Sequence, residues 1–272
     1  MKKVYAELTT ECNLHCPHCN IRNFSDGFNH DEFMKQLREF DGEIVLFGGE
    51  PTLYTDRLCE VYHDEEIRKK IKSISTNLVE VDPKIFSILT SIKYIGTSWN
   101  PYRFTPSEYI NWLNNLNWIG GSKTNVVVMI TLTEDLFQID KEEFLDMTAF
   151  WDPDNINAIR FEYLVADGLT QEYYNRADEW QADIYSRWRS RIPMDVENVK
   201  HWYFDCSEVY TLHPNGELVK GCPNHKTETV PEECYSCERA EFCRPCALHS
   251  YCTFPKKLAE AIKRKEEENA KV

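Results

Sequence analysis

The segment Glu7-Leu-Thr-Thr-Glu-Cys-Asn-Leu-His-Cys-Pro-His-Cys19 holds three cysteines in a C-x3-C-x2-C arrangement, directly after the first β-rich run of the chain. Three thiolates alone do not complete the four-ligand shell of a structural metal site. They suit either a zinc ion that borrows a histidine or a [4Fe–4S] cluster with one iron left open. An open metal position binds and polarises a small molecule, so the second alternative implies chemistry. A chance grouping is the third interpretation. The thiols are Cys12, Cys16 and Cys19, and the candidate histidines are His15, His18 and His30.

A second motif, Phe47-Gly-Gly-Glu-Pro51, closes the second β-rich run. Glycines allow a backbone to approach another group closely, because they carry no side chain. Taken alone, the motif is typical of a turn at the end of a strand.

The body of the chain alternates β-rich apolar runs with segments of helical character. This alternation predicts βα units and a parallel sheet. Six strands are too few for an eight-unit barrel, so we expect an open or partial barrel. The expected strands are Val4–Thr10, Glu43–Phe47, Ile71–Thr76, Ile92–Ser98, Asn125–Thr133 and Ala158–Val165. The expected helices are Asp31–Phe40, Asp56–Lys70, Pro83–Thr90, Pro106–Leu116, Lys141–Phe150 and residues 171–192.

Within residues 171–192, an aromatic and apolar stripe recurs at helical spacing, which is typical of core packing. The stripe consists of Trp180, Ile184, Tyr185 and Trp188. A β-hairpin is expected over Val209–Lys220, around Pro214-Asn-Gly216. The charged stretch Lys256–Lys271 is helix-prone and is expected to be a solvated terminal helix.

Seven further cysteines fall within 47 residues near the C-terminus, a stretch with no hydrophobic core of its own. Bound metal must therefore stabilise this segment. The spacing also suits a structural zinc knuckle built from the first four members of the run 234–252. The seven C-terminal cysteines are Cys206, Cys222, Cys234, Cys237, Cys243, Cys246 and Cys252.

Cys59 does not belong to this group. It lies in a helical run and is expected to be an ordinary small buried residue.

The charge of the chain is strongly negative, with 31 basic against 45 acidic residues and a net charge of −14. Such a surface repels phosphate backbones, which argues against strong non-specific binding of nucleic acid. The longest apolar run, Val126–Ile130, is far shorter than the ~20 residues of a membrane helix. The N-terminus shows no secretory signal, so we expect a cytoplasmic protein without a membrane span.

The two N-terminal motifs together resemble the radical SAM enzymes. The resemblance implies a [4Fe–4S] cluster on Cys12, Cys16 and Cys19, whose open iron chelates the amino and carboxylate groups of S-adenosylmethionine. It implies that Gly48, Gly49, Glu50 and Pro51 meet the methionine amino group. Polar residues at later strand ends, Ser75, Asn77 and Ser98, are implied cofactor contacts, and His18 takes the position of an aromatic residue near the adenine.

The C-terminal cysteine spacing resembles the SPASM domain, which is attached to many radical SAM enzymes. The chain has two residues between Cys243 and Cys246 where that pattern has three. The resemblance implies auxiliary cluster I on Cys206, Cys222 and Cys246, and auxiliary cluster II on Cys234, Cys237, Cys243 and Cys252. His213, His225 and His249 are candidates for the fourth ligand of cluster I.

The implied fold is a partial (β/α)6 radical SAM barrel followed by a small cysteine-rich α+β domain. The expected boundaries are 1–195 for the barrel, 196–254 for the SPASM-like domain and 255–272 for a charged C-terminal helix.

Three functions follow from the sequence. The first is radical SAM chemistry on a peptide or protein side chain, with a reductant such as flavodoxin or ferredoxin. The second is the same chemistry on a small molecule, a nucleotide or a modified base. The third is a non-enzymatic iron–sulfur or zinc protein that carries electrons or acts as a scaffold. Arg103 is either a partner for a substrate carboxylate or phosphate, or an ordinary surface arginine.

Overall fold

The computed structural model describes residues 2–19, 27–164, 171–188, 208–220, 261–265 and 267–268. In this part of the chain, one eight-stranded sheet has the order β6-β5-β4-β3-β2-β1-β7-β8. The strands are β1 (Lys3–Glu7), β2 (Glu43–Phe47), β3 (Ile71–Thr76), β4 (Tyr94–Ser98), β5 (Asn125–Leu132), β6 (Ala158–Tyr163), β7 (Val209–Leu212) and β8 (Leu218–Lys220).

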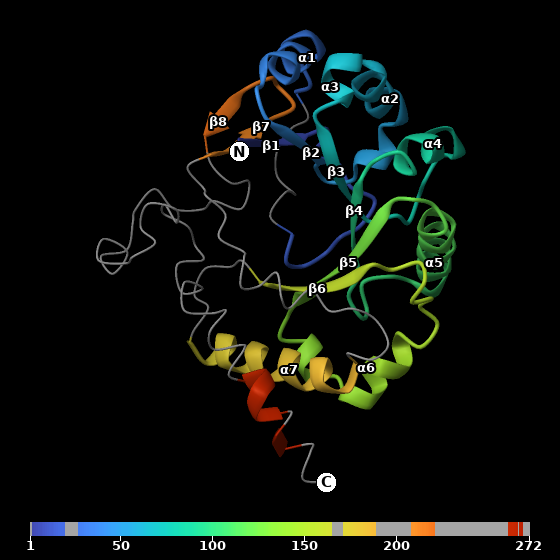
Figure 1. The fold of residues 1–272 in the computed structure, drawn as a ribbon, viewed down its shortest axis with the longest axis vertical. Coiled ribbons are helices and arrows are strands. Elements are labelled where there is room, and N and C mark those ends of the chain that lie inside the picture. Colours follow the sequence, from blue (N-terminus) through green and yellow to red (C-terminus); the bar gives the residue numbers. More distant parts are fainter. Residues whose placement is uncertain are drawn as a thin grey trace, which may run out of the picture.

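The first six strands run parallel to one another in chain order, and this confirms the predicted parallel sheet. Helical segments follow each of them. These are α1 (His30–Glu39), η1 (Pro51–Leu53), α2 (Thr55–His63), α3 (Glu65–Arg68), η2 (Pro83–Ile85), α4 (Phe86–Leu89), α5 (Pro106–Gly120), η3 (Leu136–Gln138), α6 (Lys141–Met147) and α7 (Gln171–Trp188). Figure 1 shows the helices in an arc around the outside of the curved sheet, as an open partial barrel requires.

The expected hairpin at 209–220 is present as β7 and β8, and Gly216 in its turn has φ +87°. Its place in the molecule was not predicted. β7 pairs in parallel with β1, so the hairpin extends the barrel sheet beyond its first strand. The hairpin turn also packs on α1, because the backbone N–H of Asn29 donates to the carbonyl of Pro214 at 2.9 Å.

The helical character expected over Asp56–Lys70 is confirmed, but the segment holds two helices, because the chain breaks at Asp64 into α2 and α3. Asp64 has an extended backbone, and its carboxylate accepts the N–H groups of Glu66 at 3.0 Å and Ile67 at 3.1 Å. An aspartate at the N-cap accepts hydrogen bonds from the backbone N–H groups in the first turn of the new helix. In a continuous helix, these N–H groups would donate to carbonyls of the preceding turn. The Asp64 N-cap therefore favours the start of α3 over a continuation of α2.

The sheet has an outer face against the helices and an inner face on the opposite side. Burial in β5 alternates strictly, with Val126, Val128 and their alternate neighbours fully buried. The outer face meets α5, where the indole N–H of Trp112 donates to Thr97 Oγ1 at 3.0 Å. On the inner face, a Cβ built on Gly96 would lie 2.9 Å from the Met129 side chain and 3.6 Å from Ser75 Oγ. Residues of neighbouring strands that are in register with Ser75, Gly96 or Met129 therefore also lie on the inner face.

The aromatic stripe of α7 packs in the core, as predicted. Trp180 is 5% exposed, and its ring lies 4.9 Å from Phe144 and 5.5 Å from Phe161, centroid to centroid. Ile184 is fully buried. The Trp188 side chain lies outside the described residues. The C-terminal stretch is helical where it is described, and it is not wholly solvated, because Ala261 and Ile262 are buried.

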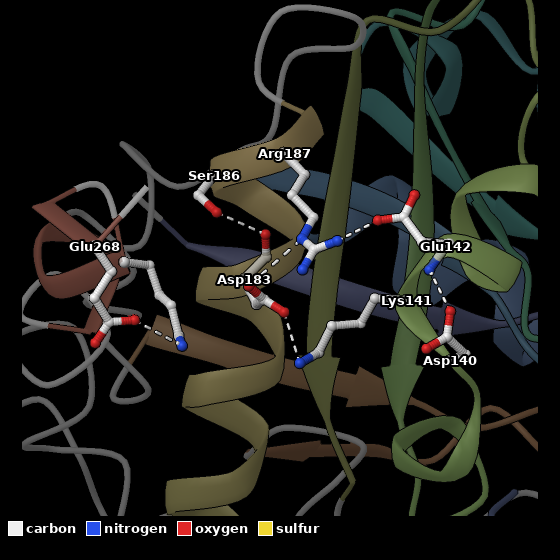
Figure 2. Close-up of polar contacts among 8 residues, drawn as sticks. Asp140, Lys141, Glu142, Asp183, Ser186, Arg187 and Glu268 are labelled. Atoms are coloured by element: carbon white, nitrogen blue, oxygen red, sulfur yellow. Dashed lines mark hydrogen bonds and ion pairs between the residues drawn. The ribbon is translucent and has the colours of Figure 1, made fainter. Parts of the chain in front are cut away.

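An ion-pair network joins α6 to α7 around the buried carboxylate of Asp183 (Figure 2). Lys141 Nζ lies 2.6 Å from Asp183 Oδ2, and Arg187 Nε lies 3.6 Å from Asp183 Oδ1. Arg187 also pairs with Glu142, at the start of α6. Lys141 and Arg187 are partly exposed, whereas the Asp183 carboxylate is buried. Water therefore screens these ion pairs only on the side of the two cations.

Replacing Asp183 with asparagine is expected to lower the free energy of unfolding by about 2 kcal/mol, since two cations then lose their buried partner. Urea denaturation followed by circular dichroism measures the change. The matched control is Glu268→Gln, which breaks only the exposed Lys265–Glu268 pair, also drawn in Figure 2. That control should cost less than about 0.5 kcal/mol. Equal losses in the two variants would contradict a specific role for the buried carboxylate.

Among the described residues, no helix is long and apolar enough to span a lipid bilayer.

Candidate functional site

The cysteine-bearing segment lies at the carboxyl edge of the sheet, directly beyond β1. It runs alongside the end of β2 in continued parallel pairing. The N–H of Leu8 donates to the carbonyl of Phe47 at 2.9 Å, Gly49 donates to Thr9 at 2.8 Å, and Glu50 donates to Glu11 at 2.8 Å. The two motifs singled out in the sequence are therefore interlocked through their backbones.

The glycines of the second motif leave room for the cysteine segment. A Cβ built on Gly48 would lie 2.3 Å from the carbonyl oxygen of Thr9, and Gly48 has φ +148°. A Cβ built on Gly49 would lie 2.2 Å from the carbonyl oxygen of Glu11. The backbone that leads into the cysteines therefore approaches Gly48 and Gly49 closely, as expected for glycines. A side chain at either position would clash with that backbone.

Glu50 is fully buried and joins the ends of β2 and β3. One carboxylate oxygen accepts the Thr52 N–H at 3.0 Å, the Thr52 hydroxyl at 2.8 Å and the Thr76 hydroxyl at 2.6 Å. The other accepts the backbone N–H of Asn77. Burial raises the pKa of Glu50, and these hydrogen bonds oppose the rise. The carboxylate thus has neutral donors around it and no ion pair among the described residues, which suits a site that receives a cationic amino group.

Asn77 connects the end of β3 to the first cysteine. Its Nδ2 donates to Asn13 Oδ1 at 2.7 Å and lies 3.8 Å from Cys12 Sγ. Its Oδ1 accepts the Val79 N–H at 2.9 Å, which orients the amide. The next residue, Leu78, is buried with φ 56°, an unusual conformation for leucine. Its N–H donates to Thr76 Oγ1 at 3.1 Å, and its carbonyl accepts from Asn115 Nδ2 at 2.8 Å. The predicted contact residue Asn77 therefore belongs to the cysteine site.

The three N-terminal thiols are free, and they differ in burial. Cys16 is buried, whereas Cys12 and Cys19 are partly buried against the same core. Burial raises the pKa of Cys12, Cys16 raises it further, and the N–H of Leu14, 3.4 Å from Sγ, lowers it. The charge of Arg103 also lowers the pKa of Cys12.

The described residues contain no group of three His, Cys, Asp or Glu side chains gathered closely enough to hold a metal ion. The donor chemistry nevertheless fits an iron–sulfur cluster, because one short loop supplies three free thiols. Within the described part of the chain, two buried donors, Asn13 Nδ2 in that loop and Arg103 Nε after β4, have no hydrogen-bond partner. Donors without an acceptor are costly when buried, and the sulfides of a cluster or an anionic ligand would satisfy them.

Two other predicted contact residues share the inner face of the sheet. Ser75 is on β3, and Ser98 is the last residue of β4, in register with Met129 of β5. Both serines are partly exposed. His18 is partly buried within the cysteine loop. The predicted cofactor contacts therefore lie at the carboxyl edge or on the inner face, where ligands of parallel α/β folds bind.

Arg57 supports the cysteine segment, and the sequence analysis did not identify it. Its guanidinium on α2 lies 3.5 Å from the centroid of the Phe28 ring and 4.4 Å from that of Tyr54. It also donates to the carbonyl of Leu8, immediately before the thiols. Arginine suits this position because its planar cation both stacks on rings and donates hydrogen bonds. No local pattern signals this role, since Arg57 and Leu8 are 49 residues apart.

A second missed contact joins the barrel to the hairpin. His213 Nδ1 lies 3.0 Å from Glu7 Oε2, at the end of β1. Glu7 is 5% exposed, so its carboxylate depends on this partner. His213, expected as a candidate ligand of an auxiliary cluster, thus uses one ring nitrogen on Glu7. The C-terminal cysteines 206, 222, 234, 237, 243, 246 and 252, with His225 and His249, lie outside the described residues.

The Glu7–His213 pair predicts a pH dependence of stability. The hydrogen bond to Glu7 is the main cause that raises the pKa of His213 above 6.5. A raised histidine pKa gives stability that is present below about pH 6.5 and is lost as the pH rises through the folded-state pKa. The gap in unfolding free energy between wild type and Glu7→Gln should therefore shrink at alkaline pH in urea titrations. In Glu172→Gln, which changes an exposed acid on α7 and leaves this pair intact, the wild-type pH profile should persist. A gap that grows with pH would contradict the assignment.

Comparison with known proteins identifies structural relatives only. No family model and no curated protein sequence matches the chain. The structure is similar to that of Streptococcus suis SuiB bound to S-adenosylmethionine, with a TM-score of 0.62, 12% identity, and coverage of 89% of this chain and 71% of SuiB. It is also similar to SuiB bound to its precursor peptide SuiA, with a TM-score of 0.62, 13% identity, and coverage of 89% and 70%. At such low identity, the similarity establishes the fold.

Proposed function

We propose that this protein is a radical SAM enzyme that acts on a peptide or protein side chain. The observation that carries the proposal is the backbone interlock between segment 8–11, which directly precedes the three thiols, and the end of β2 with the motif Gly48-Gly-Glu50. A scaffold or electron carrier has no need of a second motif packed against its thiols. The segment that leads into three free thiols is thus paired with the segment that leads into Glu50, a buried carboxylate without an ion pair among the described residues.

Cys12, Cys16 and Cys19 would hold a [4Fe–4S] cluster through three of its irons. Glu50 and the backbone of Gly48 and Gly49 would receive the amino group of S-adenosylmethionine. With both bound and one electron supplied by the reductant, the cluster and S-adenosylmethionine would supply abstraction of a hydrogen atom from a substrate carbon, with methionine and 5′-deoxyadenosine as the products of the cofactor. Ser75 and Ser98, on the inner face, would orient the remainder of the cofactor, and the core behind them would exclude water.

A peptide is the proposed substrate class for two reasons. The fold is that of a protein whose structure has been solved with a precursor peptide bound. The net charge of −14 disfavours polymeric nucleic acid. A small molecule would give the same deoxyadenosine product, so mass spectrometry of candidate peptides after the reaction, which detects a modified peptide, distinguishes the two.

The C-terminal cysteines support a further part of the proposal. Seven thiols in 47 residues would hold two auxiliary iron–sulfur clusters, with Cys206, Cys222 and Cys246 on one and Cys234, Cys237, Cys243 and Cys252 on the other. The electron would come from a reductant such as flavodoxin or ferredoxin.

The test is anaerobic reconstitution with iron and sulfide, followed by dithionite and S-adenosylmethionine. We expect 5′-deoxyadenosine in the products and about 12 irons per chain, at about four per cluster. Bound zinc without deoxyadenosine would refute the enzyme and favour the scaffold. Iron near eight per chain would refute one of the two auxiliary clusters.

A further inference from the structure

One carboxylate on the inner face has no role in the site described so far. Glu162 lies on β6 in register with Thr131 of β5. Two residues earlier, Arg160 is in register with Met129, which itself faces Ser98. Since side chains alternate along a strand, Glu162 and Arg160 share the inner face with Ser75 and Ser98. Glu162 therefore stands on the face that holds the proposed cofactor contacts, three strands away from β3.

The Glu162 carboxylate differs from the other buried acids because it makes no hydrogen bond and no ion pair with any described residue. By contrast, Glu7 has His213, Asp183 has Lys141 and Arg187, and Glu50 has four donors. Burial raises the pKa of Glu162, and the positive charge of Arg160 opposes the rise. A partly buried carboxylate without a partner is unfavourable, and such groups concentrate at binding sites.

Arg160 acts on Glu162 only through space. Residues i and i+2 on one strand face are about 6.6 Å apart along the strand, at 3.3 Å per residue. The two side chains form no ion pair in the described structure, so the carboxylate keeps its accepting oxygens available for another group. A cation is the group that a carboxylate in such surroundings binds most favourably, because it compensates the buried charge directly.

We propose that Glu162 binds the ammonium or guanidinium group of a basic side chain in the peptide substrate, on the inner face of the sheet. The inference rests on the proposed function for the peptide as substrate class. Glu162 then determines specificity. It selects a basic residue and anchors it two strands from Ser98, so that the rest of the peptide lies across the inner face toward the thiols.

The test titrates the Glu162 carboxyl group with a simple cation. Reconstituted full-length protein with ¹³C-labelled glutamate carboxyl groups is followed by NMR over about pH 4 to 9. The probe is n-butylammonium chloride, and the controls are n-butanol and sodium chloride at equal ionic strength. We expect saturating butylammonium to lower the Glu162 midpoint by about one pH unit, as an opposite charge at contact does. Neither control should move it.

Three variants assign the effect. Glu162→Gln removes the resonance and should weaken butylammonium binding at least about tenfold, the loss of a charge-assisted contact. Glu162→Asp keeps the charge and should retain part of the affinity. Glu172→Gln, an exposed acid on α7, should bind as wild type does. An unmoved midpoint, or equal binding by Glu162→Gln, overturns the inference. Absence of 5′-deoxyadenosine from wild type overturns the proposed function instead, so the two failures are distinguishable.

Discussion

Replacing Cys12 with alanine is expected to abolish 5′-deoxyadenosine formation and to lower the iron content by about four atoms per chain. In the proposed cluster, the three thiols would bind three irons and leave one iron open. With only two thiols, a second iron would also lack a protein ligand. The same result is expected for Cys16→Ala and Cys19→Ala. Iron assay and anaerobic product analysis by chromatography measure the two effects.

The matched control for the thiols is Cys59→Ala. Cys59 is a partly buried free cysteine on α2, outside the cysteine loop. It should keep both the wild-type iron content and the wild-type activity. Thermal unfolding of each apoprotein tests for general damage, because Cys12 also packs against the core and lies beside Asn77. An active Cys12→Ala variant with full iron content would exclude the N-terminal loop as the cluster site.

Gly49→Ala is expected to lower activity at least about 100-fold, the effect of displacing reacting groups by about 1 Å. The added Cβ would lie 2.2 Å from the carbonyl oxygen of Glu11 and 2.8 Å from that of Thr10. Both atoms belong to the backbone and cannot rotate away, so the thiol-bearing segment must move. Overpacking of this kind should also cost about 1–3 kcal/mol of unfolding free energy.

Gly121→Ala provides the control for a glycine without such contact. Gly121 ends α5 with φ −66°, and the nearest atom to its added Cβ lies 3.7 Å away. Its effect should stay within about 0.5 kcal/mol, with activity unchanged. The affinity for S-adenosylmethionine, measured by equilibrium dialysis, should fall in Gly49→Ala and hold in Gly121→Ala. Full activity in Gly49→Ala would show that the interlock does not position the site.

The fold class was predictable because period-two and helical patterns are local properties of the chain. The strands of the barrel lie within a few residues of their predicted bounds, and the hairpin at Pro214-Asn-Gly216 is where its turn residues indicated. The break at Asp64 was missed, because a helical pattern continues through it and only the cap geometry shows the new start. The pairing of β7 with β1 was also missed, since a short hairpin does not indicate which edge it joins.

The sequence by itself determined the donor set on which the proposed chemistry rests. Residue type and spacing along one short segment specify three thiols in a loop, and a second segment specifies the glycines beside it. The tertiary structure alone decided which groups meet across long separations. Glu7 finds His213, Arg57 supports Leu8, and Glu162 faces the inside of the sheet without a described partner. These contacts depend on strand register and helix packing. A local sequence pattern does not encode register or packing, because both result from the burial of the entire hydrophobic core.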